Sequence, residues 1–264
     1  MRYMSTGALL ASALGGAGFN VLSLAIFDAF TTPPTAERKV IIDTAVLALV
    51  AGGVWDELDA LYMLAAADSQ AALVNWKNPG TFDAVASGGP TFTADRGFTG
   101  DATDAQLDAG FNPTTAASPH FTQNSASMAA WALTDAADNK PIIGNATDQT
   151  GTNIYPNFAG DAFLRLNDAT EAEGFAVAGG TGFFLANRST STGRQGYRNG
   201  ASLGAYASNT SKAVLNEDMK ILRQGTKFSG AQVAAASFGG SLDATQQLAF
   251  YNAMLAYMQA VGAV

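Results

Sequence analysis

Apolar and polar positions follow two different periods along this chain, and the period changes near residue 65. Apolar residues are too frequent between residues 36 and 50 for a single stripe, which predicts a helix buried on more than one side. Gly52 and Gly53 end that helix. Leu58 and Leu61 follow Val54 at spacings of four and three residues, which predicts a second helix over residues 55–62.

After residue 65, short apolar runs alternate with turns rich in Gly, Asn, Asp and Thr, as in an all-β sandwich. Residues 161–167 alternate strictly, whereas residues 128–133 are apolar on both faces, as in a strand covered on both sides. Asn199-Gly200 predicts a type I′ turn and a two-residue hairpin over residues 197–203. Further strands are expected at residues 71–76, 182–188, 219–222 and 231–238.

The chain ends in a predicted helix over residues 243–261. Asp243 is placed to cap it, and Gln246 is placed to bond back as in a capping box. Two apolar lines cover more than half of its circumference, so we expect it to pack on the sandwich or on a neighbour. The chain therefore divides into residues 1–65, an N-terminal arm with two helices, and residues 66–264, a β-sandwich with a C-terminal helix.

The N-terminal thirty residues are unusually apolar. No charge occurs from Tyr3 to Phe27, so a signal peptide and a membrane span are the two alternatives. Interrupting glycines and polar residues weaken the run as a membrane span. Because ordering each residue costs about 1–2 kcal/mol, contacts must offset that cost. We expect residues 1–30 to pack on other polypeptide chains through Leu9, Leu10, Leu14, Phe19, Val21, Leu22 and Ile26.

Composition excludes several classes of function. Charged residues make up only 14% of the chain, which is typical of a surface that takes part in assembly. The net charge of −8 disfavours binding to nucleic acid. Cysteine is absent, so no disulfide, thiolate metal site or cysteine nucleophile is possible.

Several segments resemble phage and prophage virion proteins that carry a concanavalin A-like lectin/glucanase domain. The resemblance covers roughly residues 60–264 and implies a jelly-roll β-sandwich. It rests on motifs typical of a fold rather than of an activity. They are Asn75-Trp76-Lys77, the turn at residues 92–97, Phe184-Leu185-Ala186-Asn187-Arg188, Gly196-Tyr197-Arg198-Asn199-Gly200, the strand at residues 235–242 and the helix from Gln246 to Val264.

This resemblance implies a structural protein of a bacteriophage virion, as a capsid decoration, head-fibre or tail component. Its N-terminal arm, residues 1–30, would attach it to other virion proteins in multiple copies. The alternative is a lectin-like protein that recognises a host surface glycan. A glycan hydrolase ranks third.

The residues that suggest catalysis have simpler structural explanations. Ser202 lies in a G-x-S-x-G pattern, but on a hairpin, and His120, the only histidine, precedes it in the chain. Glu171 and Glu173 are the nearest approach to a paired carboxylate, and Gly174 follows them where a strand should continue. We therefore expect no enzyme, no catalytic residue and no cofactor.

Two groups of residues are candidates for ligand binding. One Gly-rich stretch contains four aspartates, Asp95, Asp101, Asp104 and Asp108. They could bind a cation such as calcium, or they could simply form turns. A sugar site needs an exposed aromatic ring near polar groups. The sequence offers Trp76, Tyr155, Tyr197 and Tyr206 without ranking them.

Overall fold

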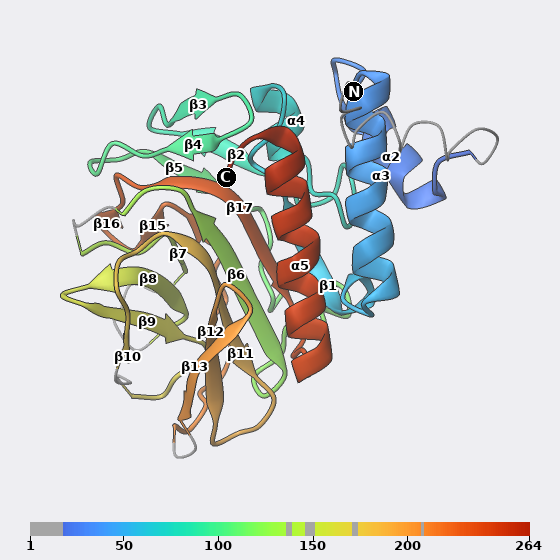
Figure 1. Ribbon diagram of the computed structural model, residues 1–264. Helices are drawn as coiled ribbons and strands as arrows, with labels where there is room; N and C mark the ends of the chain where they lie inside the picture. Colours follow the sequence, from blue (N-terminus) through green and yellow to red (C-terminus); the bar gives the residue numbers. More distant parts are fainter. Residues whose placement is uncertain (1–17, 136–138, 146–150, 171–173, 207–208) are drawn as a thin grey trace, which may run out of the picture.

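A computed structural model describes residues 18–135, 139–145, 151–170, 174–206 and 209–264. Two antiparallel sheets pack face to face, and the long helices lie together on one side of them (Figure 1). This confirms the predicted fold class, a mainly β sandwich with N-terminal helices and a C-terminal helix. The separation of the chain into two parts at residue 65 stays a prediction.

Sheet A contains the longest strands of the molecule. Its spatial order is β13 (Ala201–Tyr206), β12 (Arg194–Arg198), β11 (Gly182–Arg188), β6 (Ala126–Ala132), β17 (Gln232–Gly239), β4 (Gly97–Thr99) and β3 (Thr91–Thr93). Strand β1 (Leu58–Tyr62) pairs with the other half of β17. Every residue of β6 and β17 is buried, which explains why both read as continuous apolar runs.

Sheet B is built from shorter strands. Its order is β10 (Phe175–Ala176), β9 (Asp161–Arg165), β8 (Asn153–Phe158), β7 (Ile143–Gly144), β14 (Lys220–Ile221), β5 (Gln106–Asp108) and β2 (Val85–Ser87). A small hairpin follows β14 and consists of β15 (Arg223–Gln224) and β16 (Lys227–Phe228). Ile154, Leu164 and Ile221 point into the core, so the residues that alternate with them face outward.

Helix α5 (Ala244–Val261) covers the outer face of sheet A. Asp243 and Gln246 form the predicted capping box at its start, and Gly262 ends it in the left-handed conformation. The ring of Tyr251 stacks on Trp131 of β6 at 6.1 Å between centroids, and Phe250 of α5 meets Phe183 of the neighbouring strand β11 edge to face. Helix α3 (Ala36–Ala51) packs in turn on α5.

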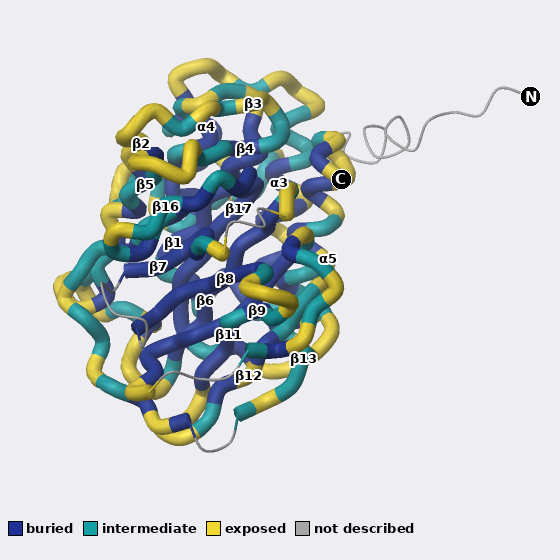
Figure 2. The backbone as a smooth tube through the Cα atoms, turned by 90° about the vertical axis from the view of Figure 1, so that its left-hand side faces the viewer, coloured by how far each residue is buried: buried dark blue, intermediate teal, exposed yellow. Residues whose placement is uncertain are grey.

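The buried residues form one continuous core. It fills the space between the two sheets and extends between sheet A and the helices, whereas exposed residues concentrate in the loops and on the outer surfaces (Figure 2). Within the described ranges, no helix is both long and apolar enough to span a membrane.

Two of the predicted elements differ from the structure. Residues 55–62 form a 3-10 turn, η1 (Trp55–Glu57), followed by strand β1, and not a helix. Pairing with β17 outweighs the helical spacing of the apolar residues here. Residues 71–76 are not a strand either, because Asp68 caps the short helix α4 (Ser69–Leu73).

The described part of the N-terminal arm folds on its own chain, which corrects part of the prediction. Helix α2 (Val21–Ala29) buries Ile26, and Phe19 packs edge to face on Phe27. Asn20 caps α2, and its backbone N–H donates to Asp43 of α3 at 2.9 Å. Because this segment forms helix α2 and packs on α3, its residues Ile26 and Phe27 are buried within the same chain. The sequence pattern did not predict this packing. Leu9, Leu10 and Leu14 lie outside the described residues.

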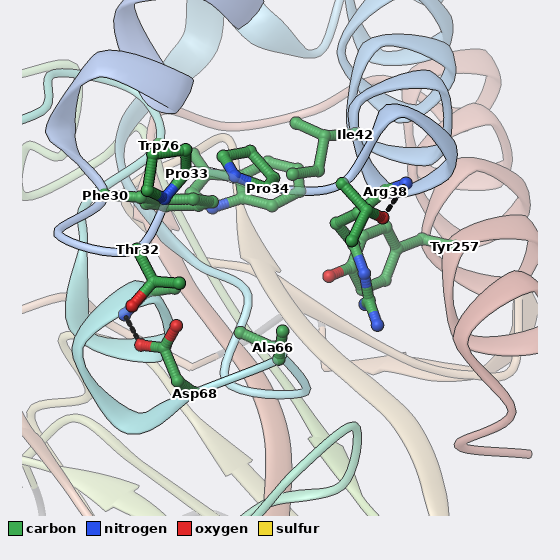
Figure 3. Close-up of a pocket in the computed structure, with 13 residues that line it drawn as sticks. Phe30, Thr32, Pro33, Pro34, Arg38, Ile42, Ala66, Asp68, Trp76 and Tyr257 are labelled. Atoms are coloured by element: carbon green, nitrogen blue, oxygen red, sulfur yellow. Dashed lines mark hydrogen bonds between the residues drawn. The ribbon is translucent and has the colours of Figure 1, made fainter.

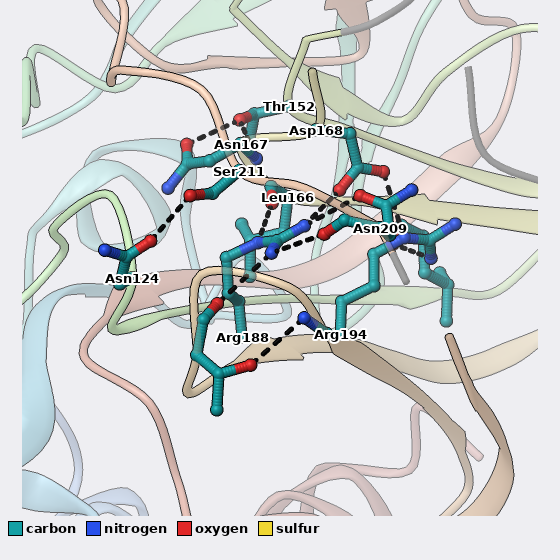
Figure 4. A network of polar contacts seen from close by, with 12 residues as sticks. Asn124, Thr152, Leu166, Asn167, Asp168, Arg188, Arg194, Asn209 and Ser211 are labelled. Carbon is teal, nitrogen blue, oxygen red and sulfur yellow. Dashed lines mark hydrogen bonds and ion pairs between the residues drawn. The ribbon is translucent and has the colours of Figure 1, made fainter. Parts of the chain in front are cut away.

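A buried ion-pair network joins the two sheets at one end of the sandwich (Figure 4). The carboxylate of Asp168 accepts from Arg188 at 2.6 Å and lies 2.9 Å from Nε of Arg194, and all three side chains are fully buried. Arg188 also donates to the carbonyls of Leu166 and Asn209. Because burying a charge is costly, this dense set of bonds is what makes three buried ions tolerable.

Replacing Asp168 with Asn should therefore lower stability strongly. The amide keeps the shape but removes the charge that both arginines contact, so we expect a loss of about 3–5 kcal/mol in the free energy of unfolding. Urea denaturation followed by circular dichroism measures it. Asp95→Asn is the matched control, because Asp95 pairs with Arg38 at a partly exposed site and should cost less than about 1 kcal/mol. Equal losses for the two variants would contradict the role of the network.

Candidate functional site

The structure does not bring the serine and histidine of the sequence pattern together. Ser202 lies on the edge strand β13, where its hydroxyl accepts from the backbone N–H of Gly204 at 3.2 Å. His120 lies before β6, with Nδ1 3.8 Å from the carboxylate of Glu57. No hydrogen bond joins Ser202 to His120 in the part of the chain that the structure describes. Glu171 and Glu173 lie outside that part.

Three of the four clustered aspartates, Asp95, Asp101 and Asp108, are engaged by the protein itself. Asp95 pairs with Arg38, and Asp108 pairs with Lys220. Asp101 accepts from the backbone N–H groups of residues 103, 104 and 105, and the bond from Ala105 contributes most to lowering its pKa to about 2. Among the described residues, no group of three or more His, Cys, Asp or Glu is arranged to hold a metal. The three backbone bonds to Asp101 are those that the turn explanation predicts.

A cavity of about 170 Å³ lies between the N-terminal helices and the sandwich (Figure 3). Trp76 and Tyr257 line it, together with Pro33, Pro34 and other mostly apolar residues. The volume is close to that of an engineered cavity that holds benzene, so the cavity suits a small apolar group. Trp76 is only 1% exposed and packs edge to face on Tyr257. This aromatic residue is therefore closed to a sugar.

The outer face of sheet B is the sandwich face that the long helices leave uncovered (Figure 1). Tyr155 and Phe163 are cross-strand partners on this face, and Phe158 joins them. The ring centroids of Phe158 lie 5.9 Å from Tyr155 and 5.7 Å from Phe163. Phe158 is 39% exposed, so its ring is available to a ligand. We call Tyr155, Phe158 and Phe163 the aromatic cluster.

A bulge in β8 assembles this cluster. Tyr155 and Phe158 are three residues apart and would point to opposite faces of a regular strand. The pairing of β8 with β9 shifts register between them, in the interval that contains Pro156 and Asn157, and this shift turns Phe158 to the outer face. Ala159 and Gly160 then close the hairpin, both with positive φ.

A polar pair is formed by Asn157, the residue before Phe158, and Asp135. The side-chain amide nitrogen of Asn157 donates to the carboxylate of Asp135 at 3.1 Å, and its carbonyl oxygen accepts from Gly160 at 3.0 Å. A Cβ atom at Gly180 would lie 2.5 Å from the Asp135 carboxylate, so the glycine lets this pair pack closely against the backbone. Asp135 is itself exposed and keeps acceptor capacity for hydroxyl groups of a ligand.

The hairpin β15–β16 borders the cluster on its other side. Tyr155 donates its hydroxyl to Gln224 at 3.0 Å, and Lys227 donates to the Tyr155 hydroxyl at 3.3 Å. Burial raises the pKa of Tyr155, which Arg165 partly opposes, so the phenol stays neutral and can act as this donor. The surface therefore combines apolar rings with donors and acceptors at its edges.

The sequence identified only one member of this cluster. Of the aromatic residues it offered, Tyr155 belongs to the cluster, whereas the hydroxyls of Tyr197 and Tyr206 bond within their own chain to Gln195 and to the Gly174 carbonyl. Phe158 and Phe163 were missed, because their approach depends on the bulge. A proline inside an otherwise alternating strand was the available signal.

Comparison with known proteins identifies the fold alone. The sequence matches no protein-family model and no curated protein significantly. In structure, the chain is similar to botulinum neurotoxin type C, whose cell entry depends on interaction with two ganglioside molecules. The TM-score is 0.54 at 13% identity, over 77% of this chain and 53% of the toxin chain. The chain thus spans about half of that structure.

Two further structures share this arrangement. One is the binding domain of paraclostridial mosquitocidal protein 1, with a TM-score of 0.53 and 11% identity over 75% of this chain and 52% of that one. The other is Trypanosoma rangeli sialidase in complex with 2,3-difluorosialic acid as a covalent intermediate. The TM-score is 0.51 at 9% identity, over 81% of this chain and 38% of the sialidase chain. At these identities the shared feature is the β-sandwich.

Replacing Asp101 with Asn tests the turn explanation of the aspartates. The folded pKa of Asp101, about 2, lies below its ordinary value of 3.8, so its charge stabilises the fold above pH 4. That contribution is lost as the pH falls from about 4 to about 2. The variant should thus be less stable at pH 5 and converge with the parent near pH 2, as measured by urea unfolding. A stability gain of the parent on adding calcium, absent in the variant, would favour a cation site instead.

Proposed function

We propose that this protein is a lectin-like binding module that recognises a glycan on the outer face of sheet B. The observation that carries the proposal is the exposed ring of Phe158 beside the Asn157–Asp135 pair. A sugar has an apolar face of C–H groups and a rim of hydroxyls. The first can pack on an aromatic ring, and the second can bond to a carboxylate and an amide.

The structural neighbours support a glycan ligand. Botulinum neurotoxin type C depends on gangliosides for cell entry, and the trypanosomal sialidase holds a sialic acid derivative. These ligands belong to proteins that are longer than this chain. Hydrolysis is not part of the proposal, because Ser202 and His120 do not form a catalytic pair.

A second candidate function is attachment to another protein, in a virion as the sequence resemblance implies. The observation that favours it is a group of exposed apolar side chains on the N-terminal helices, Val21 and Leu24 of α2 with Leu47 and Val50 of α3. No charged residue follows Asp43 within α3, so this end of the helix pair is uncharged. Attachment and glycan binding use opposite sides of the molecule and are compatible.

Phe158→Ala tests the glycan site. Removing the exposed ring takes away the apolar platform but leaves the core intact, so binding to a glycan that the parent protein recognises should weaken by about tenfold. A glycan microarray identifies the ligand, and isothermal titration then compares the two proteins. Leu248→Ala is the control, because Leu248 is an exposed apolar residue on α5, on the other side of the sandwich. Unchanged affinity in Phe158→Ala would contradict the proposed site.

A further inference from the structure

We infer that residues 1–17 of this chain pack on helix α3, over an apolar stripe formed by Leu47 and Val50. This surface lies on the side of the molecule away from the proposed glycan site. Three features of the helix pair α2–α3 point to this occupant. They are the direction of the chain before α2, the open half of one face of α3, and the lack of charge on both partners.

Helices α2 and α3 run antiparallel, and two contacts fix their alignment. The ammonium group of Lys39 lies 5.6 Å from the centroid of the Phe27 ring, and the backbone N–H of Asn20 donates to Asp43 at 2.9 Å. From residue 39 to residue 43 of α3, the partner on α2 therefore changes from residue 27 to residue 20. The chain that precedes Asn20 runs towards the C-terminal half of α3.

The face of α3 that α2 covers continues into that half without a cover. Leu47 and Val50 follow Asp43 by four and seven residues, so they share with Asp43 and Lys39 a face about 80° wide at 3.6 residues per turn. Leu47 and Val50 are each 43% exposed, whereas Asp43 is only 5% exposed. The same face is therefore covered in its first half and open in its second.

The segment before α2 is long enough to reach the stripe. The structure describes the chain from Gly18, so residues 1–17 precede it. Val50 lies seven residues beyond Asp43, which is about 10 Å along a helix at 1.5 Å per residue. Val21, the first residue of α2, is itself 74% exposed, so the segment leaves α2 at an apolar surface.

Both partners are apolar and uncharged. No charged residue occurs from Tyr3 to Gly18, and none follows Asp43 within α3. Leu9, Leu10 and Leu14 provide large apolar side chains, which gain free energy on leaving water without the cost of burying a charge. A segment tethered beside its target has an effective concentration on the order of millimolar, which favours it over a separate chain.

Cysteine labelling of the full chain tests the inference, because the chain has no cysteine of its own. Leu47→Cys and Val50→Cys should each react with N-ethylmaleimide about tenfold more slowly than Leu248→Cys, since a covered thiol reacts only when its cover opens. Leu248 is the matched control, because it is 50% exposed on α5, another helix of the same side. Mass spectrometry measures the rates, each normalised to the same variant unfolded in urea.

Removing the proposed cover should restore the reaction. Deletion of residues 2–17 should bring both thiols to within about twofold of Leu248→Cys. If the deletion leaves an insoluble protein, Leu10→Asp with Leu14→Asp in the full chain makes the same comparison, because a carboxylate at each position disfavours burial. Leu248→Cys itself should react at the same rate in every background.

The other occupants give different results, and each overturns the inference. Thiols as reactive as Leu248→Cys in the full chain would show that the stripe is open, and free for attachment to another protein. Protection that falls on dilution would show that a second copy covers it. Protection that survives both the deletion and dilution would assign the cover to another part of the chain. Each result leaves the glycan site untested and so separates this inference from the proposed function.

Discussion

The packing of α5 on sheet A decides which surface of this molecule can act. Rings of Tyr251 and Phe250 lie against Trp131 and Phe183, so one outer face of the sandwich becomes part of the core. Among the described residues, no long helix covers sheet B, so its outward side chains bond to one another, to the hairpin β15–β16 or to solvent. The same sandwich without its terminal helix would present two competing faces. With the helix, the proposed recognition is restricted to one face.

The sequence predicts well those features that depend on neighbouring residues. The capping box of Asp243 and Gln246 and the hairpin turn at Asn199-Gly200 both occur as expected, because each is made within a few residues. The strand at residues 58–62 was missed, because its partner β17 lies far along the chain. Local spacing alone resembled a helix there, and tertiary pairing decided the outcome.

The aromatic cluster shows why a site is harder to predict than a fold. Its members come from two strands, and an irregularity between Tyr155 and Phe158 brings the two rings onto the same face. Its charged border comes from a hairpin some sixty residues later, which the sequence pattern did not separate from the preceding strand. Alternation predicts which residues of a regular strand share a face, but it fails where the strand is interrupted.

The position of β17 at the centre of sheet A affects how the chain reaches its native state. This strand pairs with β1, β4 and β6, all of which precede it in the chain. During synthesis those three strands leave the ribosome first, and their buried edges have no partner until residues 232–239 emerge. Until then they are open to pairing with other chains. Pairing of β17 with these strands therefore removes the exposed edges through which the chain could aggregate.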